Sequence, residues 1–313
     1  MRSKLRNSFE SAAPSYDNAA VLARETGARM DERLSLTKIQ PRRFADIGCA
    51  TGDGVRALQK RYPSAQAIAV DYAMPMLKLV RAKSGRFARL MRKAPHMACA
   101  DACALPLANQ SMGLVWSNLM LHWFDDPLPA LREMHRVLEV GGLVMFTALG
   151  PDTLKELRAS AHTPVGADET NAKPETTMLQ GGRANDALRA VACDETPLSP
   201  AIRNFIDMHD LGDMLLAAGF ADPVMDMEMI TLTYTQPRKF LADQRHLGVG
   251  KALLGHQAWQ SWRKIFARWQ QDLQGPYPVS FEIIYGHAWK PAPRTPGPEH
   301  AVMHFHRRET VKI

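Results

Sequence analysis

Three acidic residues that accompany short apolar runs are the first candidates for chemistry in this chain. Asp46 and Asp71 each lie at the end of such a run, and Asp101 comes directly after a third. Open α/β sheets bind ligands at the carboxyl ends of their strands, so Asp46 and Asp71 are expected to face one ligand. Asp71, roughly 20 residues beyond the first turn, is placed to bind a ribose diol. Asp46 suits a ligand that bears positive charge.

A turn of small residues follows Asp46 and precedes a helix. It carries glycine or alanine at alternate positions: Gly48, Ala50, Gly52 and Gly54. This spacing is not the G-x-G-x-x-G of a dinucleotide-binding turn. Asp53 stands where the positive end of the helix would attract a phosphate, which argues against a phosphate ligand. The turn alone is compatible with a simple connection, but together with Asp71 it indicates a binding site.

The remaining apolar patterns predict an α/β protein in which strands and helices alternate. Apolar runs typical of strands cover 44–47, 67–71, 97–100, 113–118, 143–147, 224–234 and 279–289. Helical periodicity covers 4–36, with a break at Pro14, and also 74–83, 127–138, 207–218, 237–254 and 256–273. Gly141 and Gly142 are expected to end the helix at 127–138.

The residues around the first turn resemble those of the class I methyltransferases that use S-adenosyl-L-methionine (SAM). The resemblance is carried by Asp46-x-Gly48-x-x-x-Gly52, by Asp71 ahead of Met74-Pro75-Met76-Leu77, and by Asp101-Ala102-x-x-Leu105-Pro106. Ala50 replaces the middle glycine of the family pattern. The resemblance implies a Rossmann-like α/β fold with a seven-stranded, mostly parallel sheet and helices on both faces. It also implies SAM as cofactor, held by Asp46, Gly48, Ala50, Gly52, Asp71, Met76, Asp101, Ala102 and Asn118.

A longer set of segments resembles a narrower family, the malonyl-[acyl-carrier protein] O-methyltransferases of biotin synthesis. These segments are 117–123, 125–127, 131–133, 136–138, 141–142, 150–158, 205–213, 218–220, 230–234 and 277–286. The resemblance implies methylation of the free carboxyl group of a malonyl thioester, which masks its charge on the way to pimelate. The implied partner is malonyl-acyl carrier protein, an acidic protein that suits the net charge of +7, or malonyl-CoA.

Four residues are candidates for positioning the substrate: Tyr16, His122, Trp123 and Arg158. Tyr16 lies in a segment that resembles the lid of SAM enzymes, and Arg158 ends the 150–158 segment. A purely structural role is the alternative to a functional one, such as packing for Tyr16 and a surface position for Arg158. The Asn-Pro-Pro-Tyr clamp of enzymes that methylate amino nitrogen is absent. A carboxylate is already ionised at neutral pH and needs no general base. No residue spacing predicts a metal site.

Other functions remain open from the sequence alone. A related branch of mitochondrial complex I assembly factors, associated with arginine hydroxylation, shares the His122–Trp123 and Gly150–Leu154 features. A SAM-binding partner protein without enzymatic activity is a second alternative. An RNA methyltransferase fits the basic charge, but the chain has no RNA-binding module. Because no apolar run could span a bilayer and no secretory signal is present, we expect a cytoplasmic protein that binds neither membrane nor nucleic acid.

The composition changes along the chain predict five regions. An N-terminal helical lid covers 1–40, and the SAM-binding core covers 41–160. A surface insertion at 161–200 is rich in polar residues, Gly and Pro, and is expected to be partly disordered. The C-terminal part of the same sheet, with a helical substrate cap, covers 201–290, and a flexible tail covers 291–313.

Overall fold

The fold was analysed in a computed structural model that describes residues 2–85, 94–162, 202–255, 259–271 and 276–293. Most of the predicted insertion at 161–200 and of the tail at 291–313 lies outside these residues. Within the described residues, none of the helices has both the length and the apolar character needed to cross a membrane. The division into lid, core, insertion, cap and tail stays a prediction.

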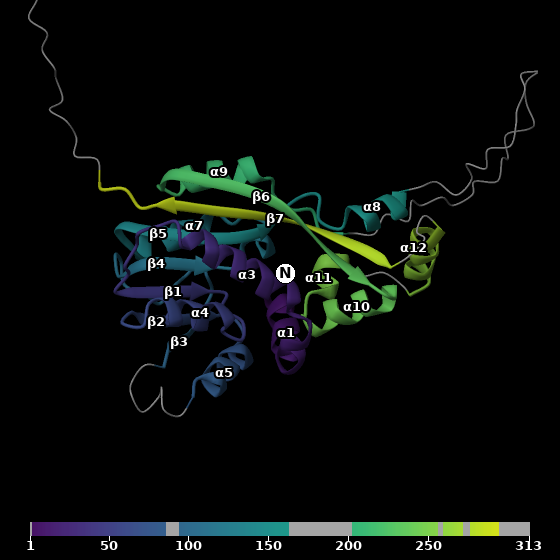
Figure 1. Cartoon of the computed structure of the whole chain (residues 1–313), viewed down its shortest axis with the longest axis horizontal. Helices are drawn as coiled ribbons and strands as arrows, with labels where there is room; N and C mark the ends of the chain where they lie inside the picture. The colour runs from purple at the N-terminus through teal and green to yellow at the C-terminus, as the bar shows by residue number, and fades with distance from the viewer. Residues whose placement is uncertain (1, 86–93, 163–201, 256–258, 272–275, 294–313) are drawn as a thin grey trace, which may run out of the picture.

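A single seven-stranded sheet organises the molecule, with strand order β3-β2-β1-β4-β5-β7-β6 (Figure 1). The strands are β1 Arg43–Ile47, β2 Gln66–Asp71, β3 His96–Cys99, β4 Met112–Ser117, β5 Leu138–Leu149, β6 Ala221–Tyr234 and β7 Tyr277–Trp289. Neighbouring pairs among β1 to β5 are parallel, whereas β7 runs antiparallel to both β5 and β6. The predicted mostly parallel sheet is therefore confirmed.

Helices cover both faces of this sheet because the strands are apolar on both sides. In β4, Leu114 and Trp116 pack into one core cluster, and Val115 between them packs into the other. The first cluster includes residues of α3 (Val21–Leu34), α4 (Asp53–Arg61) and α5 (Met74–Lys83). The second includes residues of α7 (Leu128–Val137) and α9 (Met208–Ala217). The predicted two-sided helical cover is confirmed.

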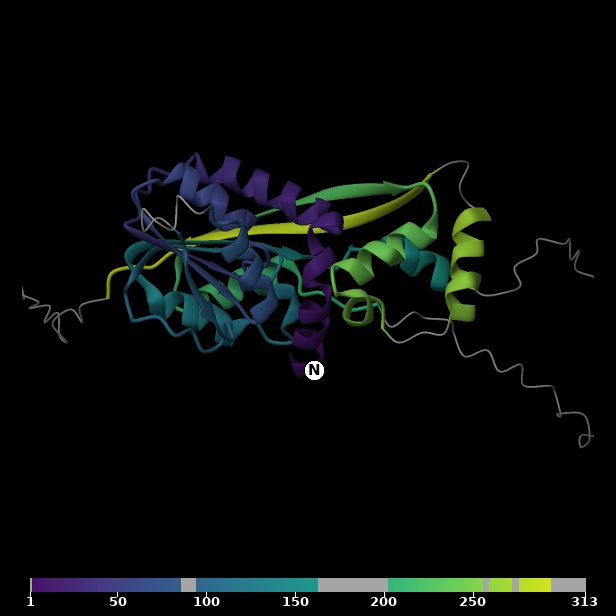
Figure 2. The same cartoon turned by 90° about the horizontal axis from the view of Figure 1, so that it is seen from below.

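The two longest strands reach beyond the parallel part of the sheet. β6 and β7 extend toward a group of helices at one end of the molecule (Figures 1 and 2). These helices are α8 (Lys155–His162), α10 (Pro237–His246), α11 (Gly250–Leu254) and α12 (Trp259–Gln271). On α12, Trp262, Phe266 and Trp269 are buried, and the ring of Trp269 meets that of Tyr277 edge to face at 5.1 Å. The strand extension thus carries a second, helical part of the core.

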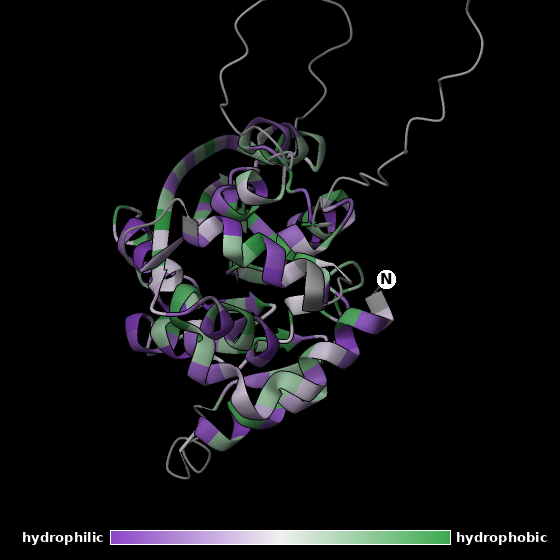
Figure 3. Ribbon diagram, turned by 90° about the vertical axis from the view of Figure 1, so that its right-hand side faces the viewer, coloured by the Kyte–Doolittle hydropathy of each residue, from purple (hydrophilic) through white to green (hydrophobic). Residues whose placement is uncertain are grey.

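The first N-terminal elements lie between the parallel strands and this helical group (Figure 2). They are α1 (Arg2–Ala12), the 3-10 turn η1 (Ala13–Ser15) with Pro14, and α2 (Tyr16–Ala19). From there α3 runs back over one face of the sheet, where Met30 and Leu34 enter the core. Hydrophobic and hydrophilic segments alternate along the helices (Figure 3), which is typical of helices with one buried face.

Two expectations about helices were wrong. Gly141 and Gly142 do not end a helix, because α7 ends at Val137 and β5 starts at the next residue. They bend the start of β5, where the Gly141 N–H donates to the Lys290 carbonyl and the Lys290 N–H donates to the Gly142 carbonyl. The helix expected at 237–254 is interrupted at Gly248, which has a φ of 76°.

Gly248 brings the break between α10 and α11 into contact with α1. A Cβ at this position would lie 2.7 Å from the Ser8 carbonyl oxygen and 2.9 Å from the Ala12 Cβ. Its left-handed backbone also favours glycine over other residues. The cap and the N-terminal helices are therefore packed backbone to backbone at this point.

Candidate active site

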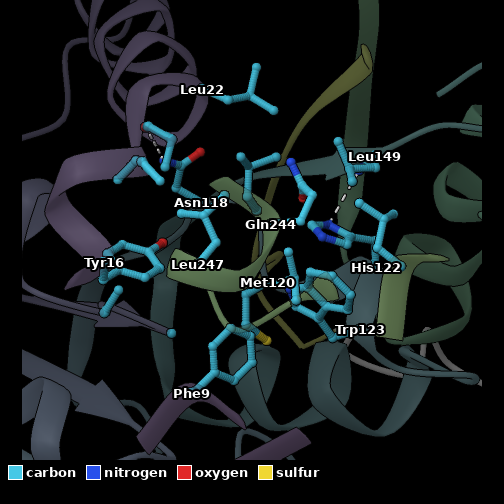
Figure 4. Close-up of a pocket in the computed structure, with 18 of the residues that line it drawn as sticks. Phe9, Tyr16, Leu22, Asn118, Met120, His122, Trp123, Leu149, Gln244 and Leu247 are labelled. Atoms are coloured by element: carbon cyan, nitrogen blue, oxygen red, sulfur yellow. Dashed lines mark hydrogen bonds between the residues drawn. The ribbon is translucent and has the colours of Figure 1, made fainter. Parts of the chain in front are cut away.

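A cavity of about 170 Å³ lies at the carboxyl ends of the strands, beneath the N-terminal helices and α10–α11 (Figure 4). Five of its lining residues are among the predicted cofactor residues: Gly48, Ala50, Asp71, Met76 and Asn118. Side chains from distant parts of the chain complete the lining, including Phe9, Tyr16, Met120, His122, Trp123, Gln244 and Leu247. Two further hollows continue this space, one beside Asp46 and one beside Asp101.

Asp71 is held rigidly at the end of β2. Its carboxylate accepts hydrogen bonds from the backbone N–H groups of Ala50 and Ala73, each at 2.8 Å. Burial raises the pKa of this carboxyl group, and those backbone hydrogen bonds oppose the rise. A carboxylate oxygen can accept more than one hydrogen bond, so Asp71 retains capacity for two hydroxyl groups of a ligand.

The turn after β1 adopts left-handed backbone at several positions. Gly48 has a φ of 77°, and a Cβ there would lie 2.8 Å from the Cβ of Met120. Ala50, at the position of the family's middle glycine, also has a positive φ of 45°. Gly52 has a φ of 86° and packs on Val80 of α5, outside the lining of the three hollows. Its place in the turn explains this glycine without a ligand contact.

Asp46 is a buried carboxyl group with no cation beside it in the described residues. It is 2% exposed, and the Val55 N–H donates a hydrogen bond to it. Burial, and then the charge of Asp71, raise the pKa of Asp46 to about 8. Nearby, the indole Nε1–H of Trp116 is buried and has no hydrogen-bond partner among the described residues. A positively charged ligand group in the hollow beside Asp46 would offset the repulsion between the carboxylates of Asp46 and Asp71.

The third hollow suits a flat apolar ring with a polar edge. Ile47, Val70 and Ala102 line it together with Asp101, whose carboxylate accepts from the Cys103 N–H at 2.9 Å. Met76 lines the central cavity and is buried in a small cluster with Ala13 and Ala73. The described residues thus fit SAM in three places. Asp46 suits a positively charged group, Asp71 suits the ribose diol, and the apolar hollow beside Asp101 suits the flat base with its polar edge.

Asn118 uses its side chain to attach α3 to the sheet. Its Oδ1 accepts from the hydroxyl groups of Thr26 at 2.9 Å and Thr147 at 2.6 Å. Its Nδ2 donates to the Ala23 carbonyl at 2.7 Å. Asn118 lines the cavity, but its hydrogen bonds join α3 to the sheet, and its role in binding the cofactor stays a prediction.

Tyr16 faces the cavity from the lid. The adjacent Asp17 accepts a hydrogen bond from the Thr51 hydroxyl at 2.6 Å and pairs with Lys83 at 2.6 Å. These contacts fix α2 on the turn after β1 and on α5. Burial, and then the charge of Asp71, raise the pKa of the Tyr16 phenol, which therefore stays protonated. Its function as a lid over the methyl donor stays a prediction.

His122 lies in the 3-10 turn η2 (Leu121–Trp123) and is buried. Its Nδ1 accepts a hydrogen bond from the Leu149 N–H at 3.3 Å, and its ring centroid lies 4.6 Å from that of Trp123. Burial, and then the positive charge of Arg203, lower the pKa of His122 to about 3. The ring is neutral at physiological pH, and its proton is on Nε2 because Nδ1 accepts.

Arg158 is not brought to the cavity. Its guanidinium group donates to the carbonyl oxygens of Thr153 at 3.2 Å and Arg203 at 2.7 Å, and to the Asn204 side chain at 3.2 Å. It therefore links α8 to the segment that follows the insertion. Arg158 does not line the cavity. Its role in positioning the substrate stays a prediction.

Gln244 is a buried polar residue of the cavity that the sequence analysis missed. It lies on α10, is 4% exposed, and lines the cavity together with His122. Phe240 and Gln244 are spaced four apart on the buried face of that helix. A polar residue on an otherwise apolar helical face was a signal, but the sequence did not show that this face meets the sheet.

The sheet order and the acids at the ends of β1 and β2 define a class I SAM-dependent methyltransferase. A family model described as a methyltransferase domain matches residues 45–146. The YcgJ protein of Bacillus subtilis shares the fold, with a TM-score of 0.53, 14% identity, and coverage of 84% of this chain and 98% of that one.

Two relatives define the family more narrowly. The malonyl-[acyl-carrier protein] O-methyltransferase of Laribacter hongkongensis is 42% identical, over 94% of this chain and 91% of the relative. The protein of that name from Gallionella capsiferriformans is 41% identical, over 93% of this chain and 91% of the relative. The chain belongs to the malonyl-[acyl-carrier protein] O-methyltransferase family. This membership favours an O-methyltransferase over the hydroxylase, binding-protein and RNA-methyltransferase alternatives.

Proposed function

We propose that this protein transfers the methyl group of SAM to the free carboxylate of a malonyl thioester on acyl carrier protein. The observation that carries the proposal, beside family membership, is the character of the cavity. Among the described residues that line it, none is Lys or Arg, and its histidine is held neutral. A carboxylate substrate is ionised at neutral pH, so the site does not have to remove a proton.

Charge neutralisation gives this cavity a specific advantage. The cofactor supplies an electrophilic methyl group next to a positive sulfur, and the substrate brings a negative oxygen. Leu149, Leu232, Leu247 and Phe281 are among the apolar side chains that line the space and exclude water. In such a medium opposite charges attract more strongly than in water, and transfer removes both of them. The chain contributes alignment of the two reactants and exclusion of water.

We propose that the carrier protein docks in a groove beside α1. This groove lies between α1 and the turn from Gly248 to Lys251, and Lys4, Arg245 and Lys251 contribute its charged side chains. In the part of the chain that the structure describes, no Asp or Glu lines it. An acidic carrier protein is complementary to such a surface. The turn separates groove from cavity, because Leu247 and Val249 line the cavity. A carrier-protein substrate also implies a cytoplasmic location.

A comparison of two acyl carrier proteins tests the proposal. The protein is incubated with SAM and either malonyl- or acetyl-acyl carrier protein, which carry the same thioester and differ in the terminal carboxylate. We expect methyl transfer to the malonyl form alone. Equal transfer to both forms, or no transfer to either by folded, SAM-binding protein, would contradict the proposed substrate.

A further inference from the structure

We infer that Gln244 and His122 form a subsite of neutral hydrogen-bond donors that holds the terminal carboxylate of the substrate. The inference rests on the proposed function and adds the residues that recognise the carboxylate. Both side chains are buried, both line the cavity, and both are drawn in Figure 4. They come from elements far apart in the chain, α10 and η2, which the fold brings to one space.

Gln244 has an amide without a partner inside the protein. Its backbone carbonyl accepts from the Val249 N–H at 3.0 Å, which fixes the end of α10. Gln244 is 4% exposed, and its side chain forms no hydrogen bond within the described residues. Neither of its amide atoms is among the fully enclosed side-chain atoms that lack a partner, so the amide keeps contact with the space of the cavity and can bind a ligand there. A ligand in the cavity would supply the missing acceptor.

His122 offers a second donor of the same kind. Its Nδ1 is used by the Leu149 N–H, so the proton on Nε2 is the one available to a ligand. Phe205 and Trp123 hold the ring, with centroid distances of 5.7 Å and 4.6 Å. Arg203 donates to the His122 carbonyl at 3.0 Å, which fixes the turn. The ring is therefore oriented before substrate arrives.

The cavity lining contains acids but no Lys or Arg among the described residues, so a carboxylate bound there must be held by neutral donors. The two acidic residues of the lining are Asp71 and Asp243, and Asp243 forms a hydrogen bond with Tyr234. Each would repel a second carboxylate. Neutral donors bind a carboxylate without balancing its charge. The negative charge thus remains available to attract the sulfonium. Arg203, which donates to the His122 carbonyl, is paired with Asp125 at 2.9 Å and does not line the cavity.

Substitution of Gln244 tests the subsite. Gln244→Met keeps the length of the side chain and removes the donor, whereas Gln244→Glu keeps the shape and adds a repelling charge. We expect KM for malonyl-acyl carrier protein to rise about tenfold or more in Gln244→Met and further in Gln244→Glu. Inhibition by acetyl-acyl carrier protein, which has no carboxylate, should change less than twofold or so. Gln236→Met, at the exposed start of the same helix, is the matched control.

SAM affinity by calorimetry and thermal unfolding establish that each variant is folded. An unchanged KM in both folded Gln244 variants would overturn the subsite, as would an equal loss of malonyl and acetyl recognition. If wild-type protein turns over malonyl-acyl carrier protein, either result leaves the proposed function standing. Absence of turnover in the wild type would instead reject that function. If Gln244→Met fails to fold, Gln244→Glu decides the question by itself.

Discussion

Asp46 shows how a single buried carboxyl group prepares a site for a cation. Its pKa is raised to about 8 by burial and by Asp71, so in the free protein it is largely protonated at neutral pH. SAM carries a positive sulfonium, and a cation beside a carboxyl group lowers its pKa. Binding of the cofactor should therefore drive a proton from Asp46 into solution.

The prediction is that SAM affinity rises as pH increases from about 6 to about 8 and that binding releases protons. The sign follows because the free protein holds the proton and the complex does not. Calorimetry in two buffers with different enthalpies of ionisation measures the number released. In Asp46→Asn, which has no proton to lose, release should disappear and affinity should fall. Equal proton release in that variant would show that another group is responsible.

His122 leads to the opposite expectation for the chemical step. Its pKa of about 3 keeps the ring neutral, so the single-turnover rate should be flat between about pH 6 and about pH 8. His122→Asn should lose rate modestly, because a donor and a packed ring are removed but no base is lost. A rising limb with a midpoint near 6.5, absent in the variant, would mean that His122 accepts a proton from an alcohol or amine substrate.

The residues found from the sequence are those whose spacing reflects the fold itself. Asp46, Gly48 and Asp71 follow from strand ends and a turn, and the structure places all three around the ligand space. Arg158 and Gln244 could not be placed in this way. Their surroundings depend on how loops and helices pack against the sheet, which the local pattern does not contain.

At the scale of elements, the segment from Gly150 to Arg158 proves to be a structural connection. The Asp152 N–H donates to the Glu282 carboxylate at 2.6 Å, and the Leu154 N–H donates to the Ser280 carbonyl at 2.7 Å. The segment is thus attached to β7 along its length. Its resemblance to the family reflects this packing, which joins α8 to the sheet.

Gly150→Ala should disturb that connection. The new Cβ would lie 2.7 Å from both oxygens of the buried Glu282 carboxylate, so one of the two must move. Overpacking of this kind costs about 1–3 kcal/mol, and we expect such a loss in the free energy of unfolding measured with denaturant. Gly85→Ala, where no atom lies within 4 Å of the added Cβ, is the control. Equal free energies of unfolding for the two variants would show that the structure accommodates a Cβ at position 150 and would contradict the prediction.

Element boundaries were predicted less well than element types. The strands and the two-sided helical cover followed from apolar patterns, but Gly141 and Gly142 were assigned to a helix end. Their bend instead lets β5 start early and pair with the end of β7. A glycine pair after an apolar helical pattern looks the same in the sequence whether it ends a helix or lies near the start of a strand. Only the pairing of β5 with β7 distinguishes the two cases. The break at Gly248 likewise depends on contact with α1.

At the scale of the whole molecule, the exposed groove beside α1 should control recognition of the carrier protein. Arg245→Glu combined with Lys251→Glu should raise KM for malonyl-acyl carrier protein roughly tenfold, because like charges then oppose each other. KM for malonyl-pantetheine, which lacks the acidic protein, should stay the same. Lys38→Glu, an exposed site outside the groove, is the control. An equal effect on both substrates would place the cations in the reaction rather than in docking.

The identity of the methylated atom tests the central claim most directly. Malonyl-acyl carrier protein is treated with SAM that carries a labelled methyl group, and the isolated product is hydrolysed with alkali. A methyl ester releases its label as methanol, and we predict that essentially all transferred label leaves in this form. Label that remains on the malonyl carbon skeleton or on a protein would show methylation at another atom and would contradict transfer to the carboxylate.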